Sequence, residues 1–163
     1  MVSDHLKQYP VVLALEESFP GAILDGHDQL GELTLVIAAA RIVEVCGALK
    51  HAHEFLRLSS ITAVDWHPAD PRFDVVYHLH SVERNQRVRL KCKLAATDPE
   101  IDSMTAVWPG ANWYEREMFD LFGIGFRHHP DLRRILMPDD WEGHPLRKDS
   151  PVHGYKYSYK DES

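Results

Sequence analysis

Residues 73–94, FDVVYHLHSVERNQRVRLKCKL, are the stretch that decides the fold, because apolar residues alternate along two runs separated by a polar turn. Successive side chains of a β-strand point to opposite faces, so each run has an apolar face for a core. Residues 83–86 reverse the chain between the runs. The sequence therefore predicts a β-hairpin. Its apolar positions are Val75, Tyr77 and Leu79 on the first strand, then Val88, Leu90, Cys92 and Leu94 on the second.

Further elements are expected upstream of the hairpin. Residues 61–66, ITAVDW, and residues 33–37, LTLVI, are apolar runs rich in β-branched side chains, which is typical of strands. Residues 39–50 predict a helix with one apolar stripe. Residues 5–19 predict a short helix in which Pro10 is a break. The stripe consists of Ile42, Val45, Cys46 and Leu49.

Two helices are expected downstream of the hairpin. Residues 99–108 begin with a proline and end before Pro-Gly, and three apolar residues share one helical face: Ile101, Met104 and Trp108. A second helix is predicted over residues 112–122, where Asn112 can cap the first turn and Glu115 can reach back to the cap. This helix should stop at Gly123.

The fold class expected from this order is α+β: a mixed β-sheet with helices packed on one side, followed by a long extended C-terminal arm. Residues 1–122 form the compact domain. Residues 123–163 contain four prolines and no sustained periodicity, so they are assigned to a docking arm. Deleting the arm is expected to leave residues 1–122 folded but unassembled. Its aromatic anchors are Phe126, Trp141, Tyr155, Tyr157 and Tyr159.

Composition excludes several classes of protein. The 163 residues suit one domain, and their formal net charge of -7 disfavours nucleic acid or an anionic membrane as partner. The longest apolar run, residues 33–40, is too short to cross a bilayer, and the N-terminus lacks a secretory pattern. Two isolated cysteines, Cys46 and Cys92, fit a reducing cytosol without a disulfide.

The triplet Glu115-Arg116-Glu117 does not predict catalysis. On a helix the two glutamates lie about 200° apart, so they cannot flank one substrate bond. We expect instead that Arg116 pairs with Asp120 one turn later.

No residues are assigned to catalysis, cofactor binding or metal binding. The histidines do not stand at a structural-zinc spacing, two cysteines cannot hold an iron–sulfur cluster, and no nucleotide-binding loop occurs. The basic row of the hairpin is interpreted as a solvated or protein-facing surface rather than a nucleic-acid site, because no aromatic platform accompanies it. This row consists of Arg87, Arg89, Lys91 and Lys93.

Three blocks in residues 115–149 carry a family resemblance: E-R-E-x-x-D-x-F-G-I from Glu115, F-x-x-H-P-D-L-R-R-I-L from Phe126, and G-H-P-L-R-K-D from Gly143. They resemble the C subunit, also described as the 30 kDa-type subunit, of proton-translocating NADH:quinone oxidoreductase, respiratory complex I. His128 departs from the pattern, since many members have a small residue there. The signature or interface positions are Glu115, Arg116, Glu117, Asp120, Phe122, Gly123, His129, Pro130, Asp131, Arg133, Arg134, Trp141, Gly143, His144, Pro145, Arg147, Lys148 and Asp149.

The resemblance implies a hydrophilic, non-redox subunit of the peripheral arm of a hetero-oligomeric complex, on the cytoplasmic side of the bacterial inner membrane. It implies contact with the quinone-site D subunit, with the B and I subunits nearby. NADH, FMN, iron–sulfur clusters and quinone would be bound by other subunits. The chain would thus be part of an enzyme without itself being catalytic.

Two other interpretations stay open. A related energy-converting hydrogenase or an F420-type dehydrogenase complex can use a homologous subunit. Neighbouring genes or co-purifying subunits would distinguish these complexes from respiratory complex I. The alternative from a different class is a stand-alone metal-binding or hydrolytic domain. Turnover or stoichiometric metal in the isolated chain would support that alternative.

Overall fold

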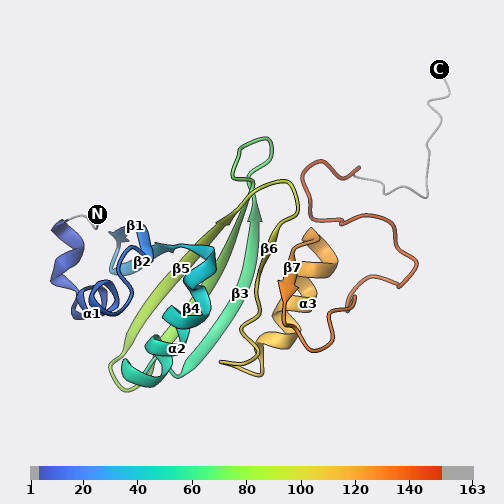
Figure 1. Cartoon of the computed structure of the whole chain (residues 1–163). Helices are drawn as coiled ribbons and strands as arrows, with labels where there is room; N and C mark the ends of the chain where they lie inside the picture. The colour runs from blue at the N-terminus through green and yellow to red at the C-terminus, as the bar shows by residue number, and fades with distance from the viewer. Residues whose placement is uncertain (1–3, 152–163) are drawn as a thin grey trace.

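The computed structural model describes residues 4–151, and its centre is a five-stranded mixed sheet (Figure 1). The strand order is β1-β2-β5-β4-β3, with β2 and β5 parallel and the other neighbours antiparallel. The strands are β1 (Ile23–Gln29), β2 (Glu32–Ile37), β3 (Arg57–Asp65), β4 (Phe73–Ser81) and β5 (Gln86–Leu94). The α+β class and the mixed sheet are therefore confirmed.

The predicted hairpin is formed by β4 and β5 with Tyr77 opposite Leu90 and Leu79 opposite Val88. All seven of its predicted inward residues are buried. Short helices η1 (Asp4–Gln8), α1 (Pro10–Ser18) and η2 (Ala39–Arg41) precede α2 (Ile42–Ala52). The stripe of α2 is completely buried in the same core, so α2 covers the inward face of the sheet, as Figure 1 shows.

The break predicted at Pro10 is confirmed, since η1 ends at Gln8 and α1 begins at Pro10, where the missing N–H costs no hydrogen bond within the helix. Strand β1 was not predicted, because its polar composition hides a strand that pairs with β2 along its whole length. Leu6 packs closely over Gly26 of this strand, since a Cβ there would lie 2.8 Å from Cδ1 of Leu6.

The predicted helix over residues 99–108 is wrong. Residues Glu100–Asp102 form strand β6, which pairs in parallel with β7 (Gly125–Arg127), and turns follow up to residue 110. The three apolar residues that suggested a helix are nevertheless all buried. A helix of ten residues is marginal in isolation, so tertiary pairing decides the backbone.

The second downstream helix is confirmed as α3 (Ala111–Phe122), which packs against β3. Its predicted cap is wrong: Gly110 occupies the N-cap position, no side chain caps the helix, and Glu115 turns into the interior. Gly123 ends α3 with a left-handed φ of 70°, as expected.

The core continues beyond the predicted boundary at residue 122. Ile124 and Phe126 are 0% and 4% exposed and belong to the main core. The following wrapping segment, residues 128–151, loops around α3 in Figure 1. Part of the predicted arm is therefore integral to the compact fold. The predicted anchors Tyr155, Tyr157 and Tyr159 lie outside the described residues.

Candidate functional site

Asp120 lies at the centre of the signature, with its carboxylate fully buried near the end of α3. Its Oδ2 accepts the backbone N–H groups of Ile135, Leu136 and Met137 at 3.0, 2.7 and 2.9 Å. Its Oδ1 accepts Nη1 of Arg134 at 2.6 Å. Burial raises the pKa of Asp120, but these hydrogen bonds outweigh it and hold the pKa below its ordinary value. We call Asp120, Arg134 and the backbone of residues 135–137 the Asp120 clamp.

Arg134 extends the clamp along the wrapping segment. Its Nη2 donates to the carbonyl oxygens of Trp141 and Gly143, each at 3.0 Å. The Arg134 side chain is only 16% exposed, so these acceptors satisfy a largely desolvated guanidinium. Arg134 thus ties two turns of the wrapping segment to α3 of the same chain.

Arg116 performs a related task one turn earlier in α3. Its Nε and Nη2 donate to the carbonyl oxygens of Arg133 and Arg134, both at 3.1 Å, and its guanidinium lies 5.3 Å from the ring centroid of Trp113. The predicted pairing of Arg116 with Asp120 is therefore wrong. Sequence spacing identified a helical neighbour, whereas the folded chain supplies buried carbonyls that need a donor.

Glu115 is the other buried carboxyl group of α3. It accepts the hydroxyl of Ser103 and the backbone N–H of Met104, each at 2.6 Å. Burial raises the pKa of Glu115 to about 7, although these two hydrogen bonds oppose the shift. Glu117 points to the opposite side and is exposed, so the two glutamates are separated as the helical geometry predicts.

His129 seals the Glu115 side chain from solvent. Its Nε2 lies 3.9 Å from Oε2 of Glu115, and both side chains are 0% exposed. The Nδ1 atom accepts the N–H of Asp131 at 3.0 Å, which places the proton of the neutral ring on Nε2, 3.3 Å from the carbonyl oxygen of Asn112. A closed pair of this kind holds the wrapping segment in place and offers no substrate access.

Gly123 lets the wrapping segment return onto α3. A Cβ there would lie 2.5 Å from the ring of His144 and 2.6 Å from Nη2 of Arg147. Arg147 donates to the carbonyl oxygens of Phe122 and Gly123 at 2.5 and 3.3 Å and lies over Phe73, 5.5 Å from the ring centroid. Desolvation, then nearby arginine charges, lowers the pKa of His144 despite its hydrogen bond to the end of α3.

A second anchor joins the wrapping segment to the sheet, and sequence reasoning missed it. Arg72 binds both oxygens of Asp65 at 2.9 and 2.8 Å and both oxygens of Asp149 at 2.9 and 2.6 Å. The N–H of Lys148 also donates to Asp65 at 2.9 Å. The hydrogen bond from Arg72 is the main reason why the pKa of Asp65 lies below its ordinary value. The available signal was a charged residue, Arg72, directly before an apolar strand.

The remaining signature residues line the outer surface. Leu136 and Leu146 are 61% and 51% exposed although both belong to the wrapping segment. Internal hydrogen bonds therefore fix the conformation of that segment while these two leucines face outward, as in a docking surface. The other exposed members are Pro130, Asp131, Arg133, Gly143, Lys148 and Asp149, whereas Phe122, Trp141 and Pro145 are half-buried.

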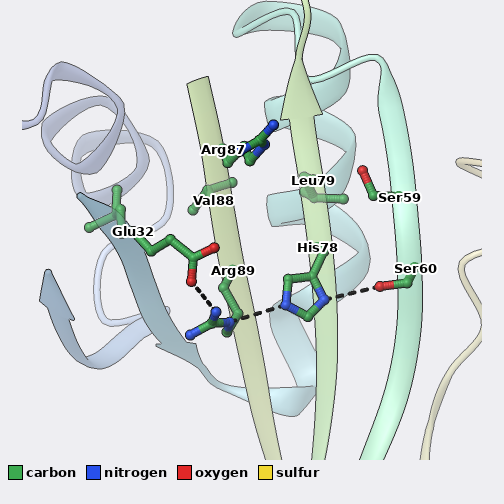
Figure 2. A pocket seen from close by; sticks show the side chains of 9 residues that line it. Glu32, Ser59, Ser60, His78, Leu79, Arg87, Val88 and Arg89 are labelled. Atoms are coloured by element: carbon green, nitrogen blue, oxygen red, sulfur yellow. Dashed lines mark hydrogen bonds and ion pairs between the residues drawn. The ribbon is translucent and has the colours of Figure 1, made fainter. Parts of the chain in front are cut away.

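Ser60 and His78 form the arrangement most similar to a hydrolase site. In Figure 2 their side chains meet on the sheet, with Ser60 Oγ 3.1 Å from Nδ1 of His78 and Arg89 donating to Nε2 of the same ring at 3.1 Å. Because Nε2 accepts, the neutral ring carries its proton on Nδ1 and donates to Ser60. A general base needs a free nitrogen at the hydroxyl, so this geometry does not activate Ser60.

Among residues 4–151, no group of three or more histidine, cysteine, aspartate or glutamate residues is arranged to hold a metal ion. Within the same residues, none of the helices combines the length and apolarity that crossing a membrane requires.

Known proteins similar to this chain are found along nearly its whole length. The C subunit of NADH-quinone oxidoreductase from Geobacter sulfurreducens is 46% identical over 144 residues, covering 88% of this chain and 89% of that protein. The protein of the same name from Citrifermentans bemidjiense is 48% identical over 143 residues, with coverage of 88% and 89%.

Two solved structures are similar to this chain in fold. A trypsin-resistant fragment of Nqo5 has a TM-score of 0.65 and 33% identity, covering 75% of this chain and 98% of the fragment. A chain of an archaeal respiratory membrane complex, the membrane-bound sulfane sulfur reductase, has a TM-score of 0.75 and 28% identity, with coverage of 88% and 85%. The family described as the 30 kDa subunit of respiratory-chain NADH dehydrogenase matches residues 35–156, and the chain belongs to this family.

Proposed function

We propose that this chain is a non-redox structural subunit of the peripheral arm of a proton-translocating NADH:quinone oxidoreductase. Its role is assembly: the sheet domain presents the wrapping segment to neighbouring subunits, which perform the electron transfer. The single observation that carries this proposal is a signature in which Asp120, Arg134 and Arg147 bind groups of the same chain while Leu136 and Leu146 face outward. Membership of the family, and curated relatives named as the C subunit of this enzyme, support it.

The proposed partners follow from the same role. The wrapping segment contacts the quinone-site D subunit, and the B and I subunits lie nearby, on the cytoplasmic side of the inner membrane. NADH, FMN, iron–sulfur clusters and quinone are bound by those and other subunits, and none by this chain. In that arrangement Arg134 and Arg147 stabilise the interface indirectly, by shaping the segment that makes it.

The test compares exposed leucines on opposite parts of the surface. Leu146→Glu changes the wrapping segment, whereas Leu13→Glu makes the same change on α1 at the same exposure of 51%. Each full-length variant is purified from membranes through a tag, and the recovered subunits and the thermal stability of the free chain are measured.

Leu146→Glu should reduce recovery of the complex at least about tenfold while Leu13→Glu leaves it unchanged, because a charge in an apolar interface is strongly unfavourable. The free chains should have equal thermal stability. Equal recovery of the complex by both variants would contradict docking through the wrapping segment.

The similarity to the sulfane sulfur reductase complex favours a second candidate, a subunit of a related respiratory membrane complex. The subunits that co-purify with the tagged wild-type chain discriminate the two. A flavin and NADH-binding pair indicates the NADH:quinone oxidoreductase, and its replacement by hydrogenase-like or sulfur-reducing subunits indicates the alternative.

A further inference from the structure

The outward face of the sheet, turned away from α2, carries the basic row predicted from the sequence. We call it the open face. Figure 2 shows four side chains from β2, β5, β4 and β3 joined across it. Glu32 pairs with Arg89, Arg89 donates to His78, and His78 meets Ser60. This chain of contacts fixes the middle of the open face and neutralises Arg89.

The two ends of the basic row are unpaired, unlike its two middle residues. In the middle, Lys91 lies 4.0 Å from the carboxylate of Asp74, and Arg89 is paired with Glu32. Arg87 and Lys93 are exposed, and within residues 4–151 neither side chain has a hydrogen-bond or ion-pair partner. An acidic protein thus presents two free cations on one strand, about 20 Å apart at about 3.3 Å per residue.

Each free cation stands beside a hollow. Arg87 lines a hollow of about 350 Å³ together with Ser59 and Ser60, whose hydroxyl groups can serve as additional donors. Lys93 lines a second hollow of about 310 Å³ that includes Trp66, an exposed aromatic side chain. Tryptophan and arginine are residue types enriched among interface anchors, and one of them lies at each end of the row.

We propose that the open face is a second docking surface, which receives an acidic protein surface whose carboxylates reach Arg87 at one end and Lys93 at the other. The partner is a protein rather than a nucleic acid, because Glu32 and Asp74 interrupt the row. A uniformly anionic backbone would be repelled by them, whereas a protein surface can match alternating charges. The inference rests on the proposed function in one respect: the partner belongs to the same assembly.

Zero-length cross-linking of the native assembly tests the contact directly. A carbodiimide joins a lysine amine to a carboxylate only where the two groups touch. Treated wild-type complex, analysed by mass spectrometry, should contain a peptide that links Lys93 to an aspartate or glutamate of another polypeptide. Lys93→Arg keeps the charge but removes the amine, so this variant should assemble normally and lose the cross-link.

A charge reversal at the other end measures the energetic contribution. Arg87→Glu and Arg84→Glu lie on the same hairpin and change the charge equally, but Arg84 is paired with Glu54 away from the open face. Arg87→Glu should weaken retention of the chain in the complex about tenfold more than Arg84→Glu, and the difference should shrink at high salt.

Several outcomes overturn the inference. A Lys93 cross-link only to Asp70 or Asp74 of its own chain, or to a second copy of it, excludes a separate partner. Duplex DNA binding that Arg87→Glu abolishes would assign the face to nucleic acid. Absence of a cross-link together with equal retention of both variants would leave the open face without a partner while the docking through Leu146 stands. If tagged wild-type chain recovers no other protein, the proposed function fails as well.

Discussion

The sheet and the region around α3 are held together by different forces within one chain. In the sheet, β4, β5 and α2 meet through aliphatic and aromatic side chains that are almost fully buried. Around α3, the wrapping segment is held by the buried carboxylate of Asp120 and by arginines that donate to backbone carbonyls, and the buried carboxyl group of Glu115 joins α3 to residues 103 and 104. Apolar packing is non-directional, whereas each of these polar contacts needs a specific partner.

This difference has an energetic consequence. Removing part of an apolar core leaves a cavity, and neighbours relax into it to some extent. Removing one member of a buried polar network leaves the others desolvated and unpaired. The sheet should therefore tolerate conservative substitutions, and the wrapping segment should be lost as a unit.

The largest expected effect comes from cutting the chain between the two regions. A chain that ends at Phe122 loses Ile124 and Phe126 from the core, at a combined cost of about 5 kcal/mol or more, which is comparable to a whole domain's stability. We expect it to be unfolded by circular dichroism at 25 °C. A chain that ends at Pro151 is the control: it keeps the core and both anchors and should unfold cooperatively. A cooperatively folded 1–122 fragment would restore the boundary expected from the sequence.

Asp120→Ala should give the next largest effect. It leaves Arg134 and three backbone N–H groups without their acceptor, and such losses cost about 3 to 5 kcal/mol. Urea unfolding of the full-length chain measures the change. Glu117→Ala, on the exposed side of the same helix, should cost less than about 0.5 kcal/mol. Similar values for the two variants would mean that the region around α3 depends on apolar packing after all.

The pH dependence of stability should separate Glu115 from the other carboxylates. Its folded-state pKa is raised from 4.5 to about 7, so its contribution to stability is complete below about pH 4.5 and is lost as pH rises through 7. A shift of this size corresponds to about 3 kcal/mol. Asp65 and Asp120 have lowered pKa values, so their contributions are lost only in acid.

The measurement is the stability of wild type minus that of Glu115→Gln in urea, taken at pH 5 and at pH 8. The difference should be more favourable to wild type at pH 5, because the substituted amide cannot ionise. A difference that does not vary with pH would show that Glu115 ionises in the folded chain as readily as in the unfolded one.

The smallest expected effect is a gain in stability, from a substitution at His128. His128 has a φ of 64°, a left-handed conformation that is unfavourable for a residue with a Cβ, and its side chain is 84% exposed. His128→Gly should therefore raise the unfolding free energy by up to about 1 kcal/mol. Arg127→Gly, at a neighbouring position within β7, should lower it. A loss at both positions would mean that the imidazole contributes more than its exposure suggests.

The sequence predicted the apolar half of the molecule well and the polar half poorly. Alternation located β4 and β5, and the stripe of α2 was correct at every position. Signature residues such as Asp120 and Arg134 were recognised as important, but their partners were not, because a hydrogen bond to the backbone leaves no pattern in residue types. The Asp65–Arg72–Asp149 anchor was missed for a different reason: its members are far apart in the chain.

The position of Asp149 determines when the fold can be completed during synthesis. Arg72 and Asp65 leave the ribosome 77 or more residues before Asp149 does. At about 5 to 20 residues per second, this interval lasts about 4 to 15 s. The nascent sheet therefore spends seconds with only part of its polar anchor satisfied, and long-range contacts of this kind form late. The wrapping segment can therefore reach its final conformation only after translation has passed residue 149.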